Sequence, residues 1–323
     1  MLYDVLPGHP PCLRLVGASF WSSRGSPLDH LLGLRRRLLR AALARDVRIA
    51  VLHRAQWLIH WIEGPPRAVE SAWRRMQRLP QQDAFRLLHR SPGRPTLRQP
   101  LHIASVFRPE APQELARHLA ALAVVHAPAA EPSRLWHELS APAASPPCSR
   151  VVIASALEHD GIDLLRRVAH RKHAEVVYQR FADSDLTQFD SGAAYADLDL
   201  GHDCAVRAQV LSRRGLGHPL VRDGLPAVRE VVLLPGNQES RCARMVDAVR
   251  PLLDDAVDPV RVHVLGRESA MVALAAGLLR ATGSTAPLLP GIVRSVHESA
   301  AMVEQVLLDA AAADGCLPKA RAA

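Results

Sequence analysis

The sequence predicts an α/β protein of two domains: a ferredoxin-like α+β domain followed by a mostly parallel, three-layer α/β domain. The 323 residues exceed the usual size of one hydrophobic core, and 48% of them are apolar, which is enough to bury two cores. The first third alternates short β-branched or aromatic runs with amphipathic stretches. The second half alternates continuous apolar runs with helical ones. A segment rich in Ala and Pro separates the two patterns.

The N-terminal elements follow the order β-α-β-β-α-β-β, which is typical of a ferredoxin-like sheet with two helices on one face. Strands are predicted at 13–19, 47–53, 57–63, 84–89 and 101–107, and helices at 27–42 and 68–78. The three residues that separate the second and third strands have hairpin spacing, although they lack the favoured Gly. A further apolar helix, 113–126, is expected to cap this domain.

The domain boundaries follow from a change in composition. We predict one domain over 1–126, an Ala/Pro-rich linker over 127–149, a second domain over 150–312 and a tail over 313–323. Within the second domain, strands are expected at 151–155, 174–179, 194–200, 205–211, 230–236, 260–266 and 286–292, with helices at 161–173, 239–253, 268–281 and 296–312. Buried strands that alternate with helices indicate a parallel sheet covered on both faces. The strands at 194 and 205 would form one antiparallel hairpin.

Charge and cysteine usage restrict the partners. Residues 1–110 carry 18 Arg and 7 acidic residues, a net charge of +11, so the remaining 22 basic and 25 acidic residues give −3. Such asymmetry can mark an acidic partner or nucleic acid. However, 38 of the 40 basic residues are Arg, a uniform bias that argues against a selected nucleic-acid patch.

The five scattered cysteines read as reduced thiols, and no signal or membrane segment is seen, so we expect a cytoplasmic location.

The segment WLIHWIEGPPRAVESAWRRMQRLPQQDAFRLLHRSP resembles the third strand, turn, second helix and following strand of the BLUF family of flavin-binding blue-light sensors. The resemblance covers about residues 12–107. It implies a flavin bound between the two helices. In that family a Tyr, a Gln and an Asn form hydrogen bonds around the flavin ring, and light changes this network. At the matching positions this sequence has Gly17, His60 and, give or take one residue, Ala42. A phenol and an amide are needed for that hydrogen-bond chemistry, so BLUF photochemistry is not expected.

Residues 150–312 are similar, in element order and local pattern, to a bacterial Ras-like small GTPase. The phosphate loop of that family, G-x-x-x-x-G-K-[ST], falls on residues 156–163, where Gly161 alone remains. The switch turn falls on 212–215, followed by Leu216 in place of a water-positioning Gln, and the guanine-reading motif falls on 266–269 without a match. Nucleotide hydrolysis is therefore not expected.

Other residue groups favour structural readings. His170 and His173, and the run 202–204, lack a recognised metal-ligand spacing, so no metal site is expected. Trp57, Trp61 and Trp73 are read as packing, with a partner-binding hot spot as the alternative. The arginines at positions 35, 36, 37 and 40 are interpreted as a solvated helix face; the alternative is contact with an acidic partner surface or with the chain's own acidic second domain.

These observations predict a non-catalytic regulatory or scaffolding protein that acts through protein–protein contacts, including contacts with its own copies, and not through membranes or nucleic acid. No enzyme activity and no cofactor is expected. One alternative is an FAD-binding blue-light photoreceptor with a rewired pocket around His60. A second alternative is an unconventional nucleotide-binding protein.

Overall fold

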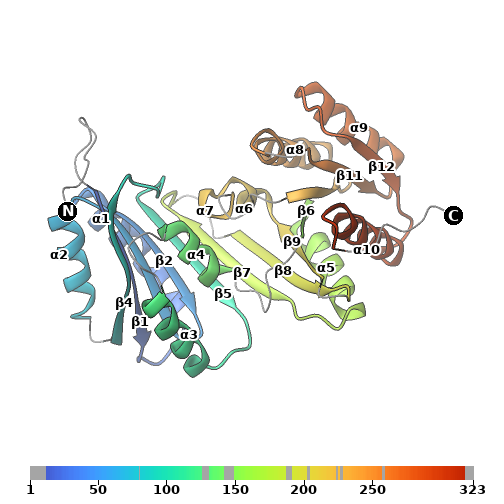
Figure 1. Ribbon diagram of the computed structural model, residues 1–323. Helices are drawn as coiled ribbons and strands as arrows, with labels where there is room; N and C mark the ends of the chain where they lie inside the picture. The colour runs from blue at the N-terminus through green and yellow to red at the C-terminus, as the bar shows by residue number, and fades with distance from the viewer. Residues whose placement is uncertain are drawn as a thin grey trace. The chain divides into compact units, whose positions relative to one another are not determined.

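The computed structural model places the elements in two compact units (Figure 1). It describes residues 12–79, 81–125, 131–141, 149–186, 191–201, 204–222, 225, 228–256 and 259–316. Unit 1 comprises residues 1–142 and 179–190, and unit 2 comprises residues 143–178 and 191–323. None of the helices in the described residues has the length and apolar character that a membrane span requires.

Unit 1 has the predicted ferredoxin-like element order. Its elements are β1 (Cys12–Trp21), α1 (Pro27–Leu43), β2 (Arg48–Arg54), β3 (Trp57–Gly64), α2 (Pro66–Met76), β4 (Gln82–Gly93), β5 (Leu101–Phe107), α3 (Pro112–Val125) and α4 (Pro132–Ser140). Together with β7 (Val177–Asp183), the sheet order is β7-β5-β2-β3-β1-β4. Neighbours pair antiparallel among β4, β1, β3 and β2, and β2 pairs parallel with β5.

Because successive side chains of a strand point to opposite faces, the two faces of this sheet pack against different helices. Leu15 and Leu58 pack in one core with α1 and α2, whereas Trp61 contacts Trp136 of α4, with ring centroids 5.9 Å apart. The hairpin between β2 and β3 turns through Ala55 and Gln56, both with positive φ. Two consecutive left-handed residues match the twist of a hairpin, so the turn forms without the glycine that the sequence lacks.

Helix α4 lies within the predicted linker 127–149. Its apolar residues Leu135, Trp136 and Leu139 are at most 2% exposed, and Arg54 donates to the Leu139 carbonyl at 3.0 Å. The sequence prediction missed this helix because it was based on the composition of the whole segment. The Ala and Pro residues on either side dominate that composition and outweigh a short amphipathic helix. Most of the remaining linker, including Cys148, and part of the predicted tail lie outside the described residues.

Unit 2 is an α/β sheet with helices on both faces. Its elements are β6 (Ser149–Ser155), α5 (Glu158–Arg171), β8 (Ser191–Asp199), β9 (Ala205–Leu211), α6 (Arg213–Gly217), α7 (Pro219–Arg222), β10 (Val228–Leu234), α8 (Glu239–Asp254), β11 (Arg261–Gly266), α9 (Ser269–Ala281), β12 (Leu288–Ile292) and α10 (Val296–Ala313). The order is β12-β11-β10-β6-β9-β8, parallel except for the predicted antiparallel hairpin of β8 and β9. Helices α5 and α10 share a core on one face, and α8 and α9 lie on the other (Figure 1).

The strand predicted at 174–179 begins later and extends further than expected. It is β7 (Val177–Asp183), whose first two residues belong to unit 2, whereas residues 179–190 belong to unit 1. There Arg35 of α1 donates to the carbonyl oxygens of Asp183 and Asp185, at 2.6 and 2.5 Å. Arg35 is therefore an anchor for this segment, whereas Arg36, Arg37 and Arg40 are exposed, as the helix pattern predicted.

Candidate functional site

The helix-covered face of unit 1 brings two of the predicted flavin-pocket positions together. Gly17 of β1 lies directly opposite His60 of β3 in the antiparallel register, so both face the helices. A Cβ atom added to Gly17 would lie 2.3 Å from Cη2 of Trp73 and 2.7 Å from its Cζ3. The indole of Trp73, which α2 supplies, thus fills the space that a side chain at position 17 would need.

His60 is buried, with 2% of its surface exposed. Its Nε2 lies 2.9 Å from Ser19 Oγ, and that hydroxyl donates to Gln82 Oε1 at 2.8 Å. Since the serine proton is used for Gln82, Nε2 of His60 carries the proton and donates to the serine. Nδ1 is then a buried acceptor, and it has no partner among the described residues.

Burial also sets the charge of this imidazole. Desolvation lowers the pKa of His60 to about 4, with the Gln82 side chain acting in the opposite direction. The ring is therefore neutral near pH 7. Trp73 completes the surroundings by edge-on contacts with His60 and Phe85, at centroid distances of 6.4 and 6.0 Å.

The third predicted position, Ala42, is fully buried near the end of α1 in the same apolar core as Trp73. An alanine contributes no polar group, so the polar atoms of this region come from β1, β3 and β4. Sequence reasoning did not connect Ser19 and Gln82 with His60. The alternation of β1 could have indicated Ser19, because it lies two residues from Gly17 on the same face.

The turn that carries the family resemblance is a structural anchor. Glu63 is fully buried, and its carboxylate accepts hydrogen bonds from Trp61 Nε1 at 3.0 Å, Thr96 Oγ1 at 2.5 Å, Thr96 N at 2.7 Å and Leu97 N at 2.8 Å. Gly64 has a φ of +149°, and a Cβ there would lie 2.7 Å from the Asp46 carbonyl. The Glu-Gly pair therefore fixes the loop after β4 and permits close approach of the backbone.

In unit 2, the predicted phosphate-loop residues form a tight strand-to-helix connection. β6 ends at Ser155 and α5 begins at Glu158, and the backbone N–H of Ala156 donates to the Leu234 carbonyl at 2.9 Å. Gly161 lies inside α5, where an added Cβ would lie 2.9 Å from Val210 Cγ1. This glycine thus lets α5 pack closely on the sheet, and the connection leaves no backbone loop around an anion.

The other two predicted nucleotide positions have different roles. Ser212 caps α6, since its Oγ accepts from the Gly215 backbone N–H at 3.1 Å, and Leu216 is buried. Gly266 ends β11, Arg267 and Glu268 follow it, and all three line a crevice at the carboxyl edge of the sheet. In open α/β sheets this edge, where connections leave in opposite directions, is the usual ligand site.

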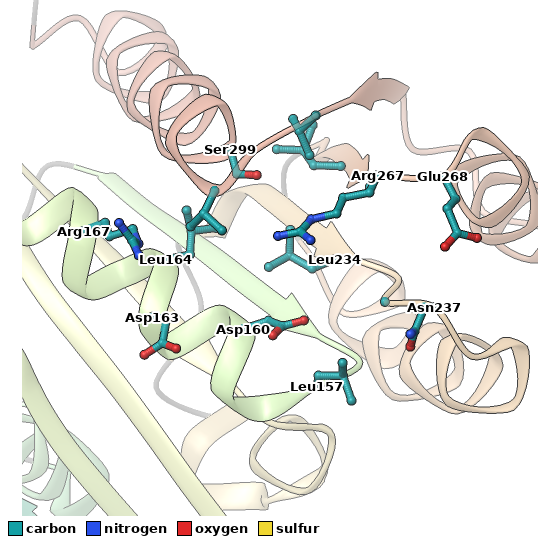
Figure 2. Close-up of a pocket in the computed structure, with 15 residues that line it drawn as sticks. Leu157, Asp160, Asp163, Leu164, Arg167, Leu234, Asn237, Arg267, Glu268 and Ser299 are labelled. Atoms are coloured by element: carbon teal, nitrogen blue, oxygen red, sulfur yellow. The ribbon is translucent and has the colours of Figure 1, made fainter.

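The crevice has a volume of about 370 Å³ and lies among α5 and the ends of β10, β11 and β12 (Figure 2). Its apolar lining is Leu157, Leu164, Leu234, Leu265, Val293 and Val296, and its charged lining is Asp160, Asp163, Arg167, Arg267 and Glu268. In the part of the chain that the structure describes, no group of three or more His, Cys, Asp or Glu side chains is arranged to hold a metal ion.

Fold and sites together define a two-unit α/β protein with a ferredoxin-like first unit and, in the second unit, a crevice at the carboxyl ends of the parallel strands. No protein-family model matches the chain, and no curated protein matches it. Among solved structures, it is similar to "BlrB - a BLUF protein, dark state structure", with 16% identity and a TM-score of 0.28 over 36% of this chain and 98% of that chain. For "BlrP1 BLUF" the identity is 17% and the TM-score 0.31, over 43% and 97% of the two chains.

A longer match is "Klebsiella pneumoniae BlrP1 with FMN and cyclic diGMP, no metal ions", with 13% identity and a TM-score of 0.28, over 86% of this chain and 76% of that chain. Identities and TM-scores this low carry no conclusion about activity, ligand or partner. The function has to be argued from the residues themselves.

Proposed function

We propose that this protein is a regulatory or scaffolding protein without catalytic activity, which acts through contacts with other proteins. The observation that carries the proposal is the position of Trp73. Its indole lies against Gly17 and edge-on to His60, on the helix-covered face where the BLUF family, which unit 1 resembles, holds its flavin. A flavin ring would have to displace this indole. Gly17 and His60 also supply neither the phenol nor the amide of that photochemistry.

Unit 2 supports the proposal from separate evidence. Its element order is a hairpin followed by alternating parallel strands and helices, and we interpret it as a Ras-like small-GTPase arrangement. The two-residue connection after β6 and the acidic side chains of Asp160 and Asp163 in α5 are unfavourable for a nucleotide phosphate. We therefore regard unit 2 as a degenerate GTPase-like domain retained for interaction.

The exposed arginines of unit 1 are the surface that we expect to contact a partner. Arg36, Arg37 and Arg40 of α1, Arg74 and Arg75 of α2, and Arg78 in the turn after α2 are exposed. A concentration of positive charge with no Lys favours an acidic protein surface, because guanidinium groups bind carboxylates in a bidentate way. A second copy of the chain is one such partner.

The first experiment is the absorption spectrum of the purified full-length protein before and after blue light, with denaturing extraction of any chromophore. We expect a colourless protein. The variant W73A, reconstituted with FAD under the same conditions, is the matched control, because it opens the space beside Gly17. A flavin band in the parent protein that shifts to the red on illumination would overturn the proposal.

That result would favour the photoreceptor alternative, for which one observation speaks. Nδ1 of His60 is a buried acceptor without a described partner, and a hydrogen-bond donor on a bound ring could satisfy it. The nucleotide alternative rests on the crevice of unit 2. Stabilisation of the parent protein by GTP or GDP in thermal unfolding would support it.

A further inference from the structure

The helix-covered face of unit 1 ends where α2 meets strand β4. This strand is the last of the sheet, beside β1 (Figure 1). An ion pair between Arg90 of β4 and Glu70 of α2, at 2.5 Å, joins the two elements. One turn further along the helix, Trp73 contacts Phe85 of β4 edge-on, with ring centroids 6.0 Å apart. Helix α2 therefore lies along the outermost strand, and the side chains between them are close to solvent.

Large apolar side chains are exposed along this edge. Leu87 of β4 is 48% exposed. It is paired with Gly17 in the antiparallel register, so it lies on the same face as the Trp73 indole that covers Gly17. Trp73 and Phe85 are half-buried, and Leu79, in the turn that leads from α2 to β4, is 41% exposed. We name the apolar strip of Trp73, Leu79, Phe85 and Leu87 the α2–β4 seam.

The charged residues beside the seam are almost all basic. Four exposed arginines lie on α2 and in the turn after it, and none of them makes an ion pair with a residue that the structure describes: Arg67, Arg74, Arg75 and Arg78. Together with the Arg90–Glu70 pair, five arginines and one glutamate give this surface a net charge of +4. Both the long-range field and direct pairing therefore favour an acidic partner.

The combination of apolar and basic groups restricts the chemistry of that partner. A nucleic-acid backbone would neutralise the arginines but would leave Leu79 and Leu87 in water. A neutral apolar surface would cover the leucines but would desolvate guanidinium groups without pairing them, which costs free energy. An acidic amphipathic helix meets both requirements, because its apolar side chains can lie on Leu87 and Trp73 while its carboxylates pair with Arg74 and Arg78.

We infer that the α2–β4 seam binds an acidic amphipathic helix of a partner protein. The inference rests on the proposed function, since it assigns the apolar contact to one part of the basic surface of unit 1. Helix α1, which carries the other exposed arginines, has no Trp, Tyr or Phe, and its one large apolar side chain with an exposed surface is Leu43, at 60%. Leu43 and Arg40 of α1 therefore serve as matched controls for Leu87 and Arg74.

The test uses the full chain and a fluorescein-labelled synthetic helix of about 15 residues, with leucine on one face and glutamate on the other. A second peptide, with alanine in place of each leucine, keeps the charge and the tendency to form a helix. Fluorescence anisotropy should show saturable binding of the leucine peptide and binding about tenfold weaker for the alanine peptide. L87S should weaken binding of the leucine peptide about tenfold, since apolar burial is lost, and R74M about threefold, since that pair is exposed. L43S and R40M should bind it as the parent does.

Three outcomes would overturn the inference. The first is that the leucine peptide does not bind, or that L87S and R74M affect it no more than L43S and R40M do. The second is a single-stranded oligonucleotide that binds more tightly than the peptide and equally to the parent and L87S, which assigns the arginines to nucleic acid. The third is self-association in sedimentation that L87S abolishes, which assigns the seam to a second copy.

Two further measurements keep the test decisive. Tryptophan fluorescence checks the fold of each variant, and R74M with its control R40M carries the test if L87S does not fold. Peptide binding that R40M weakens and R74M does not would refute the seam while leaving the proposed protein contact standing on α1. A flavin in the purified parent protein would refute the proposed function, whatever the seam binds.

Discussion

The buried carboxylate of Glu63 offers a sharp test of what holds unit 1 together. Its Oε1 accepts from Trp61 Nε1 and Thr96 Oγ1, and its Oε2 accepts from the backbone N–H groups of Thr96 and Leu97. Glu63→Gln preserves the shape and replaces one acceptor oxygen by an NH₂ group. Only one acceptor oxygen, which carries no charge, then remains for the four donors.

The cost follows from the better of the two amide orientations. If the remaining oxygen faces the two backbone N–H groups, the NH₂ group faces Trp61 Nε1, while the Thr96 hydroxyl can rotate to accept. One buried donor then loses its acceptor, at about 1–3 kcal/mol, and two hydrogen bonds lose charge assistance, at about 1 kcal/mol each. The free energy of unfolding should therefore fall by about 3–5 kcal/mol, a large share of the roughly 5–15 kcal/mol typical of a domain.

Tryptophan fluorescence measures this loss in unit 1 specifically. The chain has five tryptophans, and all of them, at positions 21, 57, 61, 73 and 136, lie in unit 1. Urea unfolding should show a midpoint lowered by on the order of 2 M. The control is Glu70→Gln, which removes an exposed ion pair with Arg90 and should cost no more than about 1 kcal/mol. A Glu63→Gln variant as stable as that control would refute the reasoning.

Three further predictions concern the same unit. Gly17→Ala should cost about 1–3 kcal/mol of stability by overpacking against Trp73, but almost nothing in a W73A background; additive effects in this double-mutant cycle would contradict the contact. Because the pKa of His60 in the folded state, about 4, lies below the ordinary 6.5, the unfolded state binds the proton first. Unfolding free energy should hold above pH 6.5 and fall by about 3 kcal/mol towards pH 4, with a smaller fall in H60Q. Arg35→Met should increase hydrogen exchange at 183–185, and substitution of an exposed arginine of the same helix should not.

The sequence predicts elements well where one face is periodic and the contacts are local. The helix expected at 113–126 is α3, one residue away at each end, and the hairpin expected at 205–211 is β9 with its antiparallel partner β8. In each case side-chain alternation and burial point to the same answer. The prediction that Trp57 and Trp61 serve packing is also confirmed, since they are 3% and 1% exposed.

Contacts between distant segments could not be predicted in this way. Arg35 and Asp183 are 148 positions apart, and nothing in the local pattern of either segment indicates the other. The same holds for Trp73, whose helical spacing predicted a buried face but not that its ring would lie on Gly17. Periodicity identifies which side of a helix is covered, whereas the particular partner depends on the tertiary arrangement.

Gly17 and Gly161, which the sequence analysis singled out, both have a packing role in the structure. In unit 1, the missing side chain of Gly17 makes room for Trp73. In unit 2, the missing side chain of Gly161 lets α5 pack closely against Val210. A side chain introduced at either position would therefore clash with its neighbours. Gly17→Tyr should be tolerated only together with a small residue at position 73, because the Trp73 indole occupies the space that the new side chain would need.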